Sequence, residues 1–217
     1  MKKIKIGLLS LGILLSLIFT YYFIIVMNAR AKTPEILHHA LSPDQIKLEL
    51  SDLTKKQLDE LLKIQDPNFY HHKGFDISTP GAGVTTISQG LVKLFYFERF
   101  KPGIAKIKQS LIARYAFDPL TPKDTILKLF INHAYMGQGN RTAIYGFANA
   151  AEFYFDKPFR ELSHDEYLAL IAMIRAPNAF HFINKREAND LRVQRMKRYL
   201  SGKYIPKDNS DFLYDRQ

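Results

Sequence analysis

The sequence predicts an all-α domain preceded by one N-terminal transmembrane helix. Three observations predict this fold class. The segment Gly7–Met27 carries no charge, helix N-cap signals precede segments whose apolar residues recur with the helical period, and no run of alternating apolar and polar residues lies between hairpin turns. The 217 residues allow a single domain in addition to the anchor.

Residues 1–30 are predicted to form a cytoplasmic tip and a transmembrane anchor. Three lysines stand among the first five residues, and they predict a cytoplasmic N-terminus. Gly7–Met27 would span about 31 Å as a helix, which is the thickness of a bilayer core. The alternative is a cleaved signal peptide, because Ala29-Arg30-Ala31 has the form of a cleavage site. The apolar region is longer than a signal peptide needs, and this favours the uncleaved anchor.

Residues 31–53, which are polar and contain Pro34 and Pro43, are predicted to be a juxtamembrane linker. Residues 54–217 are predicted to form the domain. Its first helix begins after Thr54, which forms a capping box with Gln57.

Three further helices are predicted in the second half of the chain. One begins at Pro122 after the N-cap Thr121, and another begins after Ser163 and stops before Pro177. The last spans residues 189–201 and is strongly basic.

The composition limits the partners. The net charge of +10 favours an anionic partner such as lipid headgroups or a pyrophosphate-bearing substrate. No zinc-finger, ribonucleoprotein or basic-region pattern is present, so nucleic acid is not expected. The chain has no cysteine, which excludes disulfides and thiolate metal sites, and the pair His71-His72 alone does not predict a metal site.

An aromatic stretch lies between Lys93 and Lys101. It contains Leu94, Phe95, Tyr96, Phe97 and Phe100. These side chains are predicted either to belong to the core or to form an exposed patch that enters the outer leaflet of a membrane.

The segment Ile64–Asp76 resembles the first motif of the peptidoglycan glycosyltransferases (glycosyltransferase family 51), E-D-x-x-F-x-x-H-x-G-(F or V)-D. The matching residues are Asp66, Phe69, His72, Gly74, Phe75 and Asp76. Gln65 stands in the place of the leading Glu, which in that family is the general base. A carboxylate accepts a proton and a carboxamide does not.

Gly83–Leu94 is similar to the second motif of that family, and its matching residues are Thr85, Thr86, Gln89 and Lys93. A turn rich in glycine and hydroxyl groups, followed by a lysine, suits a diphosphate. The interval before it is shorter than in the family. In the family the missing piece includes an Arg-bearing helix, and residues 78–84 are predicted to form a short loop in its place.

The third motif, R-K-x-x-E, supplies the second catalytic Glu of the family. Counting forward from Lys93 puts that position on Gln109, with Lys106 on the motif lysine, and counting back from Asn132 puts it on Ser110. Neither residue carries a carboxylate. The catalytic positions are therefore assigned to Gln65 and Gln109, with Asp66 as the one nearby carboxylate.

The later blocks, residues 123–137, 146–155 and 162–178, also resemble the family, and Asn132 matches its Asn. The chain resembles a diverged monofunctional biosynthetic transglycosylase. This resemblance implies a lysozyme-like fold, a bacterial inner membrane location, and partners that are lipid II, glycan strands, membrane lipids and other cell-wall synthesis proteins. The substrate-binding residues it implies are Phe69, His72, Thr85, Thr86, Gln89, Lys93, Lys106 and Asn132. No cofactor is evident, although the pyrophosphate leaves room for a divalent cation.

Three hypotheses follow. The chain is a working glycan polymerase with another base, a lipid II- or glycan-binding protein without catalysis, or a lysozyme-like hydrolase. The hydrolase also needs a carboxylic acid in the cleft, so it is the least favoured of the three.

Overall fold

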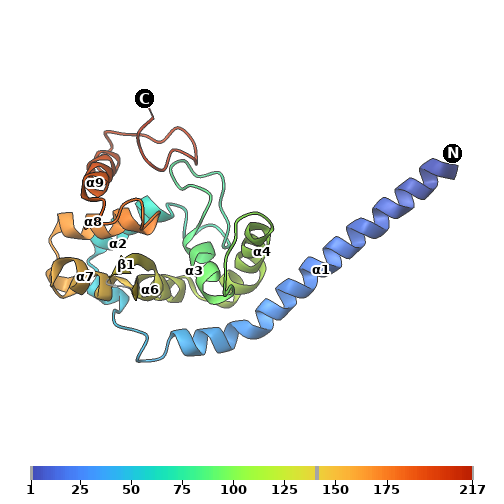
Figure 1. The fold of residues 1–217 in the computed structure, drawn as a ribbon, viewed down its shortest axis with the longest axis horizontal. Coiled ribbons are helices and arrows are strands. Elements are labelled where there is room, and N and C mark those ends of the chain that lie inside the picture. The colour runs from blue at the N-terminus through green and yellow to red at the C-terminus, as the bar shows by residue number, and fades with distance from the viewer. Residues whose placement is uncertain (1, 140–141, 217) are drawn as a thin grey trace.

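The computed structural model describes residues 2–139 and 142–216, and it shows a helical body from which one long helix projects (Figure 1). The elements in chain order are α1 (Lys2–Ala40), η1 (Leu50–Asp52), α2 (Lys55–Gln65), α3 (Ile87–Phe95), α4 (Ile104–Ile112), the π-helical turn η2 (Ala113–Phe117), α5 (Asp118–Leu120), α6 (Lys123–His133), β1 (Tyr135–Gly139), β2 (Thr142–Tyr145), α7 (Phe147–Phe155), η3 (Phe159–Glu161), α8 (His164–Ile174) and α9 (Arg186–Leu200). The predominantly helical prediction is confirmed.

Helix α1 contains the apolar segment and continues without a break to Ala40, well into the segment predicted as a linker. It is the one described helix that is long and apolar enough to cross a membrane. Its later turns pack on the body beside α4 and η2, where Ala29 and Thr33 are buried. The Thr33 hydroxyl lies 2.7 Å from the Tyr96 hydroxyl. These contacts with distant residues stabilise the polar C-terminal turns of α1 as a helix. The composition of the segment alone does not indicate such contacts, so the sequence predicted a linker there.

The capping boxes predicted at Thr54 and Ser163 are present, and Thr86 starts α3 in the same way. Helix α6 begins one residue later than predicted, because Pro122 is its N-cap and Thr121 lies outside it. Helix α9 begins at Arg186, three residues before the predicted start.

A two-stranded antiparallel hairpin was not predicted. Strands β1 and β2 pair Tyr135 with Tyr145 and Gly139 with Thr142, with an irregularity between Tyr135 and Gln138. The strands are short, and β1 contains two glycines, so the alternation that marks a strand is too weak to detect.

The core forms around α8, whose side chains Tyr167, Leu168, Leu170 and Ile171 are fully buried. Helices α7 and α9 and strand β1 contact it. The aromatic stretch belongs largely to this body, because Leu94, Phe95, Tyr96 and Phe97 are partly buried and pack against the core. The C-terminal ends of α2 and α8, the start of α3 and one face of α4 form the region where the predicted site residues gather.

Candidate functional site

Gln65 is the last residue of α2, and its side chain is buried with 6% exposure. Its amide nitrogen Nε2 donates a hydrogen bond of 3.2 Å to the backbone carbonyl of Ile171 in α8. A carboxylate in this orientation would place a negative oxygen against a carbonyl oxygen. The local geometry is therefore matched to a carboxamide.

Asp66 points away from Gln65 and is fully engaged. Its carboxylate accepts from the ring nitrogen Nε2 of His72 at 2.9 and 3.0 Å and from the backbone N–H of Ile87 at 2.9 Å. The other ring nitrogen of His72 accepts from the N–H of Gly74 at 3.0 Å. Asp66 and His72 thus join the first motif to the start of α3, and their polar atoms face this junction.

Phe69 and Asp76 also support the loop of the first motif. Phe69 is buried, and the ammonium of Lys123 lies 4.7 Å from its ring centroid. Burial raises the pKa of Asp76, but hydrogen bonds from Thr79, Ser78 and Asn68 outweigh it and hold that pKa well below its usual range. The carboxylate therefore remains ionised and fixes the turn that leads into residues 78–84.

Thr86 and Gln89 form the capping box of α3, so their polar groups are used within the fold. Nε2 of Gln89 also donates to the Ser110 hydroxyl at 2.8 Å. Thr85 is different, because its partly exposed hydroxyl accepts a hydrogen bond of 2.9 Å from the ammonium of Lys106. Of the hydroxyl and amide residues in the second motif, Thr85 is the one directed at a cation.

Gln109 lies on α4 with 1% exposure, and its Nε2 donates to the backbone carbonyl of Gln89 at 2.6 Å. Its buried Oε1 has no hydrogen-bond partner among the described residues. Ser110, the other position reached by counting, is only partly buried and donates to the carbonyl of Lys106 at 2.9 Å. Gln109, like Gln65, therefore donates its amide to a backbone carbonyl.

Three cations gather beside Thr85. Burial, together with the nearby positive charges of Arg175 and Lys93, lowers the pKa of Lys106 to about 8. Lys93 is exposed at the rim, with its ammonium 5.4 Å from the ring centroid of Phe100. Across the described part of the chain, none of these three side chains pairs with a carboxylate. Such a cluster of unneutralised cations suits an anionic ligand.

Arg175 was not among the predicted site residues. It follows α8 directly, and its Nη1 donates to the carbonyl of Ala82 at 3.1 Å. The available signal was its position immediately before Ala176-Pro177, where the helix must end. Nothing local indicated that this helix end meets the loop of residues 78–84.

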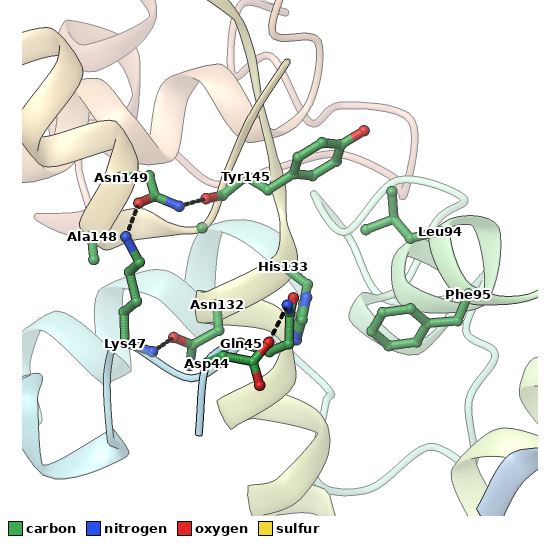
Figure 2. Close-up of a pocket in the computed structure, with 11 residues that line it drawn as sticks. Asp44, Gln45, Lys47, Leu94, Phe95, Asn132, His133, Tyr145, Ala148 and Asn149 are labelled. Atoms are coloured by element: carbon green, nitrogen blue, oxygen red, sulfur yellow. Dashed lines mark hydrogen bonds between the residues drawn. The ribbon is translucent and has the colours of Figure 1, made fainter. Parts of the chain in front are cut away.

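Asn132 lies elsewhere. Its side chain accepts from the N–H groups of Lys47 and Leu48 and donates to the carbonyls of Leu48 and Lys128. It borders a hollow of about 470 Å³ at the far end of α3, drawn in Figure 2. Lys93 directly precedes Leu94 and Phe95, which line this hollow, but neither Thr85 nor any of the three cations lines it. Asn132 secures the segment that follows α1, and the structure does not bring it together with the other predicted residues.

No carboxylate of the described residues forms a hydrogen bond or ion pair with the side chain of Gln65, Gln109 or Lys106. Asp118 is buried and accepts from the Ser88 hydroxyl and the Lys123 ammonium, so its carboxylate is already engaged. Within the described ranges, no group of three or more His, Asp or Glu side chains could hold a metal ion.

Comparison with known proteins identifies the family. The Transglycosylase family profile matches residues 34–201. The chain is 32% identical over 157 residues to penicillin-binding protein 1A of Neisseria cinerea, which covers 66% of this chain and 19% of that protein. It is 29% identical over 151 residues to penicillin-binding protein 1B of Haemophilus influenzae, which covers 64% of this chain and 19% of that protein.

The match to penicillin-binding protein 1A of Vibrio cholerae is 28% identical over 181 residues and covers 77% of this chain and 21% of that protein. The chain thus spans about a fifth of the length of these curated relatives. The expected lysozyme-like fold is confirmed together with the family. The chain belongs to the transglycosylase family.

Proposed function

We propose that this protein is a membrane-anchored member of the family that binds lipid II or nascent glycan at this site and polymerises it poorly or not at all. Family membership supports a peptidoglycan glycosyltransferase-like function. One observation carries the proposal further: Gln65 and Gln109, at the two assigned catalytic positions, are buried and donate their amides to backbone carbonyls. A site built around two amide donors has no general base at either position.

The cation cluster beside Thr85 supports binding. Thr85, Lys93, Lys106 and Arg175 offer hydroxyl and cationic groups that suit the pyrophosphate of a lipid-linked sugar. Any divalent cation would be held by the pyrophosphate oxygens, because no carboxylate of the described residues contacts this cluster. The same cations account for the slow polymerisation that the proposal includes, because they would still stabilise the leaving group.

The anchor and its orientation belong to the proposal. We infer that α1 crosses the bacterial inner membrane once, with its N-terminus in the cytoplasm and the domain outside. The uncleaved form is favoured because Ala29 is buried and Ala31 lies within the same unbroken helix, so the cleavage site is folded against the body. Other cell-wall synthesis proteins remain proposed partners.

Two measurements on the full-length chain in detergent micelles test the function. The first is lipid II binding, which we expect to be saturable and to weaken on Lys106→Ala and much less on Lys55→Ala, an exposed lysine of α2. The second is glycan polymerisation, which we expect to be absent or slow. Robust polymerisation would refute the binding-protein proposal, and absence of lipid II binding would refute the proposed function as a whole.

A further inference from the structure

Residues 203–216, here called the C-terminal segment, pack against the short loop of residues 77–84. The N–H of Gly81 donates to the carbonyl of Asp208 at 2.8 Å, and the N–H of Gly83 donates to the carbonyl of Asn209 at 2.6 Å. The side-chain amide of Asn209 donates to the carbonyl of Ile77. Three hydrogen bonds thus tie this loop to a part of the chain more than a hundred residues away.

The same segment holds Arg175. The guanidinium carbon lies 3.9 Å from the ring centroid of Phe212, while Nη1 donates to Ala82. A Cβ atom built on Gly83 would lie 1.5 Å from Nη2 of Arg175, so the guanidinium occupies the space that a side chain at this position would need. Gly83 also has φ +69°, which favours glycine independently. Arg175 is therefore held between a ring on one side and the loop on the other.

The C-terminal segment is itself firmly placed. The Tyr214 ring is buried and stacks on the Tyr199 ring at 4.4 Å, and its hydroxyl donates to the carbonyl of Ile64, the residue before Gln65. Arg192 of α9 donates from Nη1 to the carbonyl of Phe212 at 3.2 Å. The ring under Arg175 is thus fixed to two helices of the core.

We propose that the C-terminal segment is a positioning element of the anion site, in which Phe212 holds the Arg175 guanidinium beside Thr85 and Lys106 ready for a pyrophosphate group. The inference rests on the proposed function, because it assigns that site its ligand chemistry. A guanidinium held on a ring face loses little conformational freedom when it binds, and it presents a fixed fork of donors to phosphate oxygens. Phe212 acts through Arg175 and is a positioning residue.

The test measures binding of inorganic pyrophosphate and of lipid II to the full-length chain in detergent micelles. Phe212→Leu removes the ring face and keeps an apolar side chain, whereas Phe212→Tyr keeps the ring. Phe182→Leu is the matched control, because the Phe182 ring lies under another guanidinium, that of Arg186, at 4.2 Å. We expect Phe212→Leu to weaken pyrophosphate binding about three- to tenfold, with near wild-type binding for the other two variants.

A pH profile separates positioning from general loosening of the fold. Arg175 beside Lys106 contributes to the lowered pKa of Lys106, and the other cation facing it is Lys93. When Arg175 is no longer held, the pKa of Lys106 rises, so binding by Phe212→Leu should persist to higher pH than binding by the wild type. A variant that is merely less stable would show no such shift.

The outcomes are distinct. If the wild type binds neither pyrophosphate nor lipid II, the proposed function fails and the inference fails with it. If the wild type binds both ligands, and Phe212→Leu binds pyrophosphate as well as Phe182→Leu does, the positioning role is overturned while the proposed function stands. Equal losses in Phe212→Leu and Phe212→Tyr with an unchanged pH profile would also overturn it, since the effect would then be structural.

Discussion

When an amide nitrogen replaces one oxygen of a carboxylate, a hydrogen-bond acceptor of the side chain becomes a donor. At Gln65 and Gln109 that nitrogen donates to the carbonyls of Ile171 and Gln89, which connects α2 to α8 and α4 to α3. Each glutamine therefore joins two helices at a position that we assign to a catalytic glutamate of the family. Under the proposed function, the amide nitrogen that forms the helix-to-helix hydrogen bond stands where the general base would otherwise carry an oxygen.

We expect Gln65→Glu to raise glycan polymerisation above that of the wild type. General base catalysis contributes roughly 10²–10⁴-fold, and burial beside a carbonyl and Asp66 would raise the pKa of the new carboxyl towards neutral pH. Complete rescue is not expected, because Gln109 and the short loop remain. Gln57→Glu is the matched control, since it introduces the same group on the same helix and preserves the capping box. Robust wild-type polymerisation that survives Gln65→Ala would show that another residue is the base.

Binding of lipid II should weaken as the pH rises through about 8. Burial and the neighbouring cations lower the pKa of Lys106 to about 8, so the ammonium that attracts pyrophosphate loses its proton above that value. Titrating the dissociation constant from pH 6.5 to 9.5 measures the effect. Lys106→Ala should bind weakly with a flat profile, and a flat profile in the wild type would contradict the assigned role.

At the scale of the element, the N-terminus of α3 depends on Asp66, which is 1% exposed and accepts hydrogen bonds from His72 and Ile87. Asp66→Asn exchanges one acceptor for a donor and should lower the free energy of unfolding by roughly 1–3 kcal/mol. Thermal unfolding in detergent measures the change. Asp59→Asn, at an exposed position of α2, should have little effect, and equal effects of the two variants would show that the buried contacts do not stabilise the helix.

Local signals in the sequence predicted the helices better than they predicted which residues meet at the candidate site. The capping boxes at Thr54 and Ser163 act over three residues, so sequence spacing reveals them. The contact between Asp66 and His72 also lies within one motif, since the two residues are six positions apart. Arg175 and Phe212 were not predicted as site residues, because they lie far in the chain from the loop of residues 78–84 beside which they pack. The hairpin was not predicted because both strands are short and β1 contains two glycines.

At the scale of the whole molecule, membrane topology can be tested cleanly because the chain contains no cysteine. Lys203→Cys, at an exposed position of the body, should react with a membrane-impermeant maleimide added to spheroplasts. Lys3→Cys should react only after the cells are permeabilised. The reverse pattern would invert the proposed orientation, and loss of the Lys3→Cys label from the mature chain would indicate cleavage.

In the proposed anchor, the continuity of α1 would determine how the body is oriented relative to the bilayer. The apolar turns and the turns that pack beside α4 belong to one helix, so the direction in which the body faces depends on helical phase. Each residue inserted between Met27 and Ala29 would turn the body by about 100° around the helix axis and raise it by about 1.5 Å. A flexible tether would absorb such an insertion, but a helix cannot. The fold therefore tolerates a change in the amino-acid composition between Met27 and Ala29 better than a change in the number of residues there.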